Sequence, residues 1–284
     1  MLKKIKTIFE LVKFSHSIFA LPFALGAMLV AAQGWPDVKT FLLIVAAMVT
    51  ARSAAMAFNR LVDADIDAKN RRTQNRHIPQ RLLTKKSVAL FTLACVILFL
   101  VTCTFINSLS FILSPFVLLF ILGYSFSKRF TWASHLWLGA SLGLAPLAAW
   151  VAVTNQWPWP ALSLGAAVTF WVAGFDIIYA TQDFEFDCKE KLQSIVARFG
   201  LAKGLRISRA FHLMSVFFLF WFGFQNHLGI IYGATVCLIA AGLFYEQHLI
   251  KPTDLSKINA AFFNMNGMIS LLFLIGTLLE INAR

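Results

Sequence analysis

Two short strings of the sequence carry acidic side chains at a spacing that could bind a metal ion. The first contains Asn59, Asp63 and Asp67, and the second contains Asp183 and Asp187. A helix turns once in about 3.6 residues, so side chains four apart lie on one face. Carboxylate oxygens are hard ligands that suit Mg²⁺, which shares its coordination shell with substrate phosphates. The four aspartates therefore predict a Mg²⁺ site that handles a diphosphate.

The second string begins at Asp176, and its spacing puts Asp176, Tyr179, Asp183 and Asp187 on one helical face. The plain alternative for either string is a solvated helix end whose acids pair with nearby Arg and Lys. The chain has only 13 acidic residues, and the two strings hold most of them. Both strings follow spans that emerge on the same membrane side, where facing carboxylates repel unless a cation lies between them. We therefore favour a site over a solvated end.

Basic residues near the strings could complete such a site. Arg72 and Arg76 follow the first string, and Lys128 closes a later apolar segment just after Tyr124. A departing diphosphate gains negative charge, so it needs positive charge from the protein as well as from the metal. We expect Lys128 and Arg72 to supply it. The alternative for Lys128 is a charge that stops a membrane span.

Arg52 differs from these residues because it lies in the middle of an apolar segment. It precedes Asn59 by seven residues and therefore shares the same helical face. A charged side chain inside a membrane is costly and is usually retained for function. Arg52 is expected to bind either the acidic group of a second substrate or the carboxylates of the site itself.

The elements that must position these residues are membrane-spanning helices. Hydrophobic residues make up 59% of the 284 positions and charged residues 13%, so a soluble domain could not cover the apolar surface. A span needs about 20 residues. The segments long enough for one or two spans are 14–36, 38–59, 87–127, 130–175, 210–245 and 258–279. The three longest contain polar or Pro-bearing breaks, at 107–108, 154–158 and 225–227.

This pattern predicts an all-α polytopic membrane protein with about nine transmembrane helices in one bundle around a central cavity. One domain is expected to span residues 1–284. Residues 1–13 predict an interfacial amphipathic helix rather than a cleaved signal peptide. Segments 60–86 and 183–209 are expected to be loops that cap the site.

The basic residues predict the orientation of the chain. With the N-terminus in the cytoplasm, 22 of the 25 Lys and Arg residues fall on the inside. A multi-pass protein of the inner (plasma) membrane is expected, with the site on the cytoplasmic side. Contacts with anionic lipid account for the net charge of +12, so nucleic acid is not expected as a partner. No obligate protein partner is expected either.

The two strings carry a family resemblance. Asn59-x₃-Asp63-x₃-Asp67, followed by Arg72 and Arg76, resembles the first Asp-rich motif of the UbiA superfamily of intramembrane prenyltransferases. Asp176-x₂-Tyr179-x₃-Asp183-x₃-Asp187 resembles the second motif. The segment from Tyr124 to Arg129 resembles the loop between them. The resemblance covers essentially the whole chain.

The resemblance implies a reaction and roles for the residues. Asp63, Asp67, Asp183 and Asp187 would bind Mg²⁺ and, through it, the diphosphate of a polyprenyl donor, with help from Asn59. Arg72 and Lys128 would stabilise the departing diphosphate. Asp176 and Tyr179 would line the cavity near the allylic cation or the acceptor ring. Arg76 and Tyr124 are further substrate-binding candidates.

Segments 14–22 and 197–200 are most similar to the bacterial 4-hydroxybenzoate polyprenyltransferase group, parts of which are linked to menaquinone. One departure from the family pattern is Arg60, which stands where an acidic residue usually follows Asn59. Transfer to an aromatic acid, 4-hydroxybenzoate, is expected. A naphthoate acid remains open as the acceptor, as do haem and chlorophyllide. An ion-coupled transporter is disfavoured, because its charges usually lie near the membrane midplane.

Overall fold

The computed structural model describes residue 11, residues 19–250, residues 252, 254, 255 and 258, and residues 260–284. Apart from Leu11, the predicted interfacial helix over 1–13 lies outside the described residues. Every regular element within the described part of the chain is a helix. The chain divides into two compact units. One contains residues 38–126 and Leu11, and the other contains residues 19–37 and the described residues from 127 onward.

The first unit contains one short and three long helices. These are α3 (Val38–Val62), α4 (Ala64–Lys69), α5 (Lys85–Ile106) and α6 (Ser108–Ser127), which reaches the boundary of the unit. Helix α3 packs along α5. Thr84 caps α5 by accepting a hydrogen bond from the Ser87 N–H, at 3.1 Å. Asn107 separates α5 from α6, which confirms the break predicted at 107–108.

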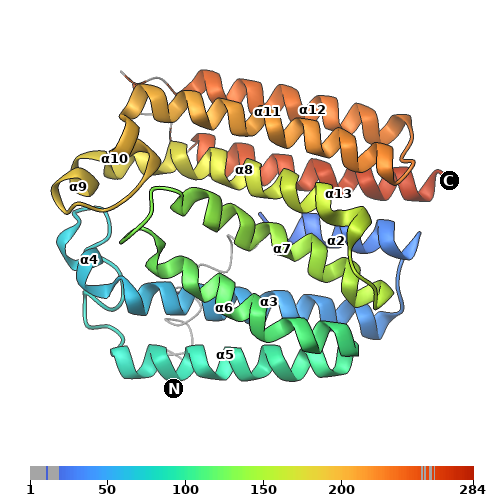
Figure 1. Cartoon of the computed structure of the whole chain (residues 1–284), viewed down its shortest axis with the longest axis horizontal. Coiled ribbons are helices and arrows are strands. Elements are labelled where there is room, and N and C mark those ends of the chain that lie inside the picture. Colours follow the sequence, from blue (N-terminus) through green and yellow to red (C-terminus); the bar gives the residue numbers. More distant parts are fainter. Residues whose placement is uncertain (1–10, 12–18, 251, 253, 256–257, 259) are drawn as a thin grey trace. The chain divides into compact units, whose positions relative to one another are not determined.

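The second unit is built around α8 (Leu162–Ala180), a largely buried helix that packs against two long neighbours (Figure 1). These neighbours are α7 (Ser134–Thr154) and α11 (Leu201–Gln225). The remaining elements of the unit are α2 (Leu21–Ala32), η2 (Trp159–Ala161), η3 (Thr181–Asp183), α9 (Phe184–Lys189), α10 (Ile195–Phe199), α12 (Ile230–Leu249), the π-helix η4 (Ala260–Met265) and α13 (Asn266–Asn282).

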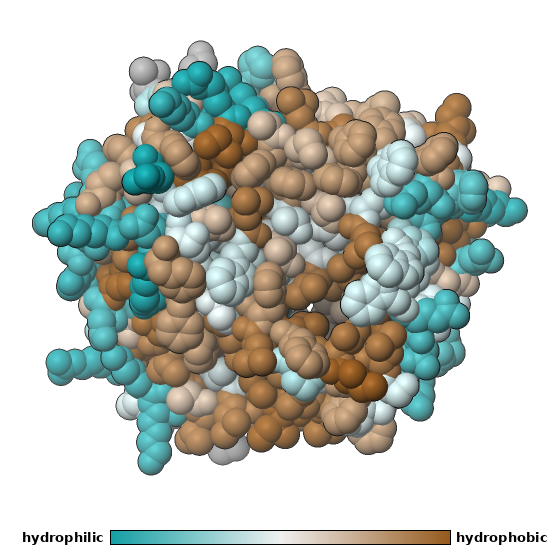
Figure 2. Space-filling view, viewed as in Figure 1, coloured by the Kyte–Doolittle hydropathy of each residue, from teal (hydrophilic) through white to brown (hydrophobic). Residues whose placement is uncertain are grey.

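Seven helical stretches of the described chain are long and apolar enough to cross a membrane. They are α3, α5, α6, α7, the continuous stretch Trp159–Lys189 that contains α8, α11 and α12. Of two shorter apolar helices, α2 falls within the segment predicted at 14–36, and α13 overlaps the segment predicted at 258–279 but ends at Asn282. Figure 2 shows that hydrophobic side chains cover most of the visible face, with hydrophilic ones toward its margins. The chain is therefore a multi-pass helical membrane protein, which confirms the predicted class.

The two segments expected to cap the site contain more helix than the sequence suggested. Helix α3 runs to Val62, and α4 follows at once, so loop structure begins only after Lys69. In the second segment, α9 and α10 are short helices and α11 starts at Leu201. Gly200 makes the turn between α10 and α11 with φ of 80°, a conformation that side chains other than glycine rarely adopt.

Candidate active site

The first acidic string forms one continuous helical face across the junction of α3 and α4. The Asp63 N–H donates to the Asn59 carbonyl at 2.9 Å, and the Asp67 N–H donates to the Asp63 carbonyl at 2.8 Å. This i to i−4 pattern continues through the point where α3 ends. The three side chains therefore stack one turn apart, as their spacing predicts.

The carboxylates on this face are buried, whereas the acid between them is not. Asp63 is 3% exposed and Asp67 is 4% exposed. The Asn59 side-chain amide donates to Asp63 Oδ2 at 3.1 Å. Asp65 points away, with a side chain that is 87% exposed and paired with Lys85 at 2.9 Å. Helical periodicity thus separates the two site candidates from a solvated neighbour.

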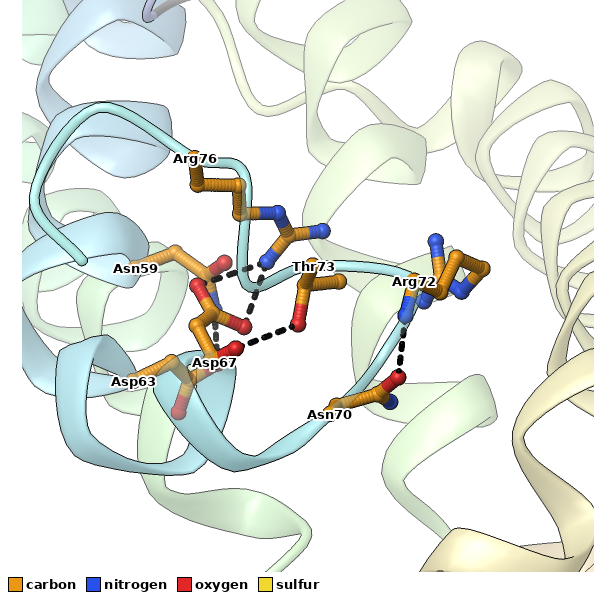
Figure 3. Close-up of polar contacts among 7 residues, drawn as sticks. All are labelled: Asn59, Asp63, Asp67, Asn70, Arg72, Thr73 and Arg76. Carbon is orange, nitrogen blue, oxygen red and sulfur yellow. Dashed lines mark hydrogen bonds and ion pairs between the residues drawn. The ribbon is translucent and has the colours of Figure 1, made fainter. Parts of the chain in front are cut away.

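Arg76 reaches back to Asp67 from the loop after α4 (Figure 3). Its Nη1 atom lies 2.7 Å from Asp67 Oδ1 and 2.8 Å from Oδ2. The Thr73 hydroxyl donates to the backbone carbonyl of Asp67 at 3.1 Å. Further along the loop, Ile78 and Leu83 pack in a core cluster with residues of α3, α4 and α5. The burial of these two side chains holds the loop against the acidic face.

Two other arginines of this region lie in different environments. Arg72 is exposed, and its backbone N–H donates to the Asn70 side chain at 2.8 Å. In Figure 3 the Arg72 side chain extends away from Asp63 and Asp67, so its predicted role at the diphosphate stays a prediction. Arg60 is only 8% exposed and lies within range of the charges of Asp63 and Asp67. The residue that departs from the family pattern therefore adds a cation to the acidic face.

The second acidic string spans the end of α8, the 3₁₀ turn η3 and the start of α9. Asp176 lies in α8, Asp183 ends η3, and Asp187 lies in the first turn of α9. Asp183 and Asp187 are partly exposed and close enough for their charges to interact. Lys128 and His135 lie within charge range of Asp187. The second string thus combines two carboxylates with a nearby lysine, and the roles predicted for these three residues stay predictions.

Lys128 is held by contacts between two loops of the second unit. It follows α6, and its backbone carbonyl accepts a hydrogen bond from the Gln193 N–H at 2.7 Å. The Ser134 hydroxyl, at the start of α7, donates to the Gln193 carbonyl at 3.4 Å. Gln193 belongs to the segment directly after α9. These two bonds keep the backbone of Lys128 beside the string that contains Asp187.

Ser194 connects the same segment to Asp187. Its hydroxyl oxygen accepts a hydrogen bond from the Ala197 N–H at 3.1 Å and so caps α10. The Ser194 side chain also bonds to Asp187, where the ionised carboxylate accepts. A pocket of about 270 Å³ borders this point. Its lining residues include Asp187, Cys188, Lys191, Gln193 and Arg198.

The structure places the other predicted residues in three settings. Arg52 lies in α3, partly buried, and its buried Nε atom has no hydrogen-bond partner among the described residues. Tyr124 lies in the last turns of α6 rather than in a loop, and it is partly buried. Tyr179, near the end of α8, packs against Phe262 with ring centroids 4.2 Å apart and the rings tilted by 32°. The roles predicted for these residues stay predictions.

The carboxylates fit Mg²⁺ as two pairs rather than as one preformed cluster. Across the described ranges, no three His, Cys, Asp or Glu side chains are grouped to hold a metal by themselves. Each string instead presents a pair of carboxylates one turn apart. Mg²⁺ keeps several waters and is usually bound by one or two carboxylates together with substrate phosphates. Paired, hard oxygen ligands beside arginine and lysine therefore fit a Mg²⁺–diphosphate complex.

Sequence reasoning missed His135, Gln193 and Ser194. His135 Nδ1 lies 2.7 Å from Asp176 Oδ2, and the other two residues support Lys128 and Asp187. A histidine in an otherwise charge-free apolar segment was a signal for the first. Ser194 stands just before a short helix, which is a capping signal. Gln193 acts through its backbone, so its residue type gave no signal.

These observations define the class of the protein: it is a multi-pass helical membrane protein with two Asp-rich helix ends. The chain belongs to the UbiA prenyltransferase family, whose model matches residues 20–268.

The similarity to proteins of known name extends over nearly the whole chain. A 4-hydroxybenzoate octaprenyltransferase from Vibrio vulnificus is 32% identical over 275 residues, which cover 94% of this chain and 95% of that protein. A 4-hydroxybenzoate octaprenyltransferase from Saccharophagus degradans is also 32% identical, with coverage of 90% and 85%.

Solved structures share the fold. A UbiA homolog from Aeropyrum pernix superposes with a TM-score of 0.84 and 30% identity, over 94% of this chain and 98% of that chain. A UbiA homolog from Archaeoglobus fulgidus, solved with DMAPP and Mg²⁺ bound, has a TM-score of 0.77 at 20% identity, over 98% and 100% of the two chains. The second similarity shows the fold alone.

Proposed function

We propose that this protein transfers a polyprenyl group from polyprenyl diphosphate to the ring of an aromatic acid, 4-hydroxybenzoate, in the biosynthesis of a ubiquinone-type respiratory quinone. The observation that carries this proposal is the similarity, over nearly the whole length, to proteins named 4-hydroxybenzoate octaprenyltransferase. The two Asp-rich strings supply the chemistry that such a transfer needs.

The reaction exchanges one bond for another. The carbon–oxygen bond of the allylic diphosphate breaks, and the diphosphate leaves with the electron pair. A ring carbon ortho to the phenol hydroxyl group then forms a carbon–carbon bond to the allylic cation. The same ring carbon loses its proton, which restores the aromatic ring. The protein must therefore stabilise a developing anion, keep water from the cation and accept a proton.

The first string contributes the acidic face of α3 and α4. Asp63 and Asp67 are proposed to bind Mg²⁺, which when bound neutralises the diphosphate and helps it to leave. Asn59 orients Asp63, and Arg76 orients Asp67, through the hydrogen bonds that the structure contains. Arg72 is proposed to contact the diphosphate directly.

The second string contributes Asp183 and Asp187, also as proposed Mg²⁺ ligands. Lys128 lies within charge range of Asp187, so it is well placed to stabilise a departing diphosphate beside that carboxylate. Ser194 restrains Asp187 by hydrogen bonding. Tyr179 and Asp176 lie earlier along α8, where they are proposed to contact the cation or the acceptor ring, and Tyr124 is proposed as a further substrate contact.

The setting of Arg52 supports the proposal that the acceptor is an acid. It lies seven residues before Asn59 in α3, about 10 Å farther along the helix axis. Its buried Nε atom has no hydrogen-bond partner among the described residues, which leaves a donor for an anionic ligand. A carboxylate is the natural partner for a guanidinium in a partly desolvated setting. We propose that Arg52 binds the carboxylate of the acceptor.

We place the protein in the inner membrane, with its N-terminus and both strings on the cytoplasmic side. The distribution of Lys and Arg supports this orientation. The test is labelling of intact cells with a membrane-impermeant maleimide. A cysteine introduced at Gln156 of a cysteine-free protein should react, and native Cys188, which is exposed beside Asp187, should react only after the cells are opened. The reverse pattern would overturn the orientation.

The proposed reaction is tested with membranes that contain the overproduced protein, Mg²⁺ and labelled geranyl diphosphate. A panel of aromatic acids is offered, which includes 4-hydroxybenzoate, a hydroxynaphthoate and benzoate as a ring without a phenol. The proposal requires a prenylated product from 4-hydroxybenzoate and none from benzoate. Prenylation of the hydroxynaphthoate alone would favour a role in menaquinone biosynthesis. No product with any acid would overturn the proposed function.

A further inference from the structure

A histidine on α7 and an aspartate on α8 form a close hydrogen-bonded pair in the second unit. His135 Nδ1 lies 2.7 Å from Asp176 Oδ2. The side chain of His135 is 5% exposed and that of Asp176 is 20% exposed. An ionised carboxylate only accepts hydrogen bonds, so Nδ1 carries the hydrogen in this contact. The histidine is thus buried behind a carboxylate that remains partly open.

The packing of α7 against α8 fixes this pair. Gly139 and Gly143 follow His135 at intervals of four, so they lie on the same face of α7. A Cβ atom at Gly139 would overlap the backbone carbonyl of Thr169, and one at Gly143 would overlap that of Gly165. The two helices therefore approach as closely as their backbones allow. This close approach brings the side chains of His135 and Asp176 together.

The far side of the imidazole makes no hydrogen bond to any residue that the structure describes. His135 Nε2 is buried and has no hydrogen-bond partner among the described residues. A buried polar atom without a partner costs free energy, so the pair is not explained as the most stable way to join two helices. An apolar pair of similar size would join them without leaving a buried nitrogen unsatisfied. A function for Asp176 would account for the cost.

The position of Asp176 separates it from the proposed Mg²⁺ ligands. It precedes Asp183 by seven residues, or about 10 Å along a helix. That distance is too long for both carboxylates to bind one ion directly, since Mg²⁺–oxygen distances are about 2 Å. Asp176 would therefore not share an ion with Asp183, and one of its oxygens is oriented by the imidazole of His135.

We propose that Asp176 accepts the proton that the acceptor ring loses, and that His135 is a positioning residue that holds Asp176 for this step. The inference rests on the proposed function. The ring carbon–hydrogen bond breaks, its electron pair returns to the ring, and the proton binds a carboxylate oxygen of Asp176. His135 keeps the Nδ1 hydrogen bond to Oδ2 and so prevents the carboxylate from rotating away. The proton returns to water after the product leaves.

The test is an isotope effect on purified protein, because a purely structural pair would not change it. The substrates are geranyl diphosphate with Mg²⁺ and 4-hydroxybenzoate, either normal or deuterated at the two ring carbons ortho to the hydroxyl group. Asp176→Asn keeps the shape of the side chain but cannot take the proton. Its kcat should fall by about 10²- to 10⁴-fold, the range for loss of a general base. Slow proton loss should give a larger deuterium effect on kcat than in the wild-type protein.

Two substitutions of His135 examine the positioning role. Asn places an amide nitrogen near the position of Nδ1, whereas Gln places it near the position of Nε2. His135→Asn should therefore keep more activity than His135→Gln. His135→Gln should show a reduced kcat and a raised isotope effect, with the KM for geranyl diphosphate and the Mg²⁺ requirement unchanged.

Control variants separate this effect from unfolding and from loss of the donor site. Ser163→Ala removes a 2.7 Å hydrogen bond between α8 and Gln225, far along the same helix. It should lower the melting temperature without changing the isotope effect. Asp183→Asn should impair the donor and Mg²⁺ dependence without raising the isotope effect.

The inference is overturned if Asp176→Asn and His135→Gln lower kcat with no increase in the isotope effect. It is also overturned if both substitutions change the KM for geranyl diphosphate. If His135→Gln does not fold, Asp176→Asn decides the proton acceptor and His135→Asn, by its own isotope effect, decides the positioning role. A wild-type protein that prenylates no aromatic acid would instead refute the proposed function. The two failures are therefore distinguishable.

Discussion

The guanidinium of Arg76 lies against both carboxylate oxygens of Asp67, with Nη1 2.7 Å from Oδ1 and 2.8 Å from Oδ2. Asp67 is 4% exposed, so the pair is largely shielded from water on the acid side. In such a setting the arginine offsets the cost of burying a charge. It also fixes the direction in which the Asp67 oxygens point.

Loss of this arginine should destabilise the metal-free protein. Arg76→Ala leaves a buried carboxylate without its cation, which should cost about 2–3 kcal/mol in the free energy of unfolding. The cost is below that of a fully buried pair, because the Arg76 side chain is 26% exposed. Mg²⁺ bound at Asp67 should restore more stability in the variant than in the wild-type protein. Thermal unfolding in detergent, with EDTA or Mg²⁺, measures both effects.

The matched control for this prediction is Lys85→Ala. It removes an ion pair of similar length, with Asp65, whose side chains are 56% and 87% exposed. Such a pair contributes little, so the melting temperature should hardly change. If Arg76→Ala is as stable as Lys85→Ala and does not respond to Mg²⁺, the Arg76–Asp67 pair has no role in the metal site.

Substitution of Arg52 should separate the acceptor from the donor. If Arg52 binds the carboxylate of 4-hydroxybenzoate, Arg52→Leu removes one charge-assisted bond in a partly desolvated site. That loss should cost about 2–3 kcal/mol, or a 30- to 150-fold rise in the KM for the acceptor. The KM for the prenyl diphosphate should stay nearly constant. Steady-state kinetics with each substrate varied in turn provide the measurement.

Lys128→Ala is the complementary variant. It should weaken binding of the donor and slow the release of diphosphate, and it should leave the acceptor KM unchanged.

Arg52 could instead neutralise the carboxylates of the first string. Arg52→Leu would then impair Mg²⁺ and donor binding together, with a constant acceptor KM. That result would remove the main argument for an acidic acceptor.

Gly174 should tolerate no side chain, because His212 packs against it. A Cβ atom at this position of α8 would overlap the imidazole ring of His212. That ring is held by Gln247, which also bonds to Ser208, and Ser208 donates to the Gly174 carbonyl at 2.7 Å. Gly174→Ala should therefore cost about 1–3 kcal/mol through overpacking.

The control for Gly174 is Gly233→Ala in α12, where a Cβ atom would meet nothing within 4 Å. Gly233→Ala should leave the melting temperature equal or raise it, because alanine favours helix. Gly174→Ala should also lower kcat, since Asp176 lies only two residues away. A stable and fully active Gly174→Ala protein would show that the buried hydrogen-bonded group around His212 adapts freely.

Glu280 of α13 should stabilise α12 by capping it. Its two carboxylate oxygens accept hydrogen bonds from the Gly229 N–H at 2.7 Å and the Tyr232 N–H at 3.2 Å. A negative charge at a helix N-terminus is favourable. Glu280→Gln should lower stability by about 1 kcal/mol, and Glu280→Ala by about 2 kcal/mol, because it leaves N–H groups without partners. The melting temperatures of Glu280→Gln and Glu280→Ala show which substitution destabilises the protein more.

Arg284, which bonds to Glu280 Oε1 at 3.1 Å, is the control for this cap. Its side chain is 40% exposed, so Arg284→Ala should cost less than either substitution of Glu280. Equal losses for Arg284→Ala and Glu280→Ala would mean that the ion pair, rather than the helix cap, supplies the stability.

Local features of the site could be predicted from the sequence. The spacing of Asn59, Asp63 and Asp67 predicted that they share one helical face, because helical periodicity depends only on neighbouring residues. The burial of Asp63 and Asp67 and the exposure of Asp65 are findings of the structure. The breaks at 107–108, 154–158 and 225–227 were likewise local, since polar and Pro-bearing sequences between apolar segments favour helix ends.

Contacts between distant segments could not be predicted in the same way. His135 meets Asp176 across 41 residues only because glycines let α7 approach α8 closely. Arg76, rather than Arg72, reaches Asp67 because the loop after α4 is held by the burial of Ile78 and Leu83. Both outcomes depend on tertiary packing, which residue spacing along one helix does not specify.

The most direct test of the account measures the release of diphosphate and the formation of prenylated acid together. Purified protein receives geranyl diphosphate and 4-hydroxybenzoate, with EDTA or with Mg²⁺. We expect equal amounts of both products with Mg²⁺, none with EDTA, and a loss of about 10²-fold or more for Asp63→Ala or Asp183→Ala. Full turnover with EDTA, or in a protein that lacks both aspartates, would contradict the account.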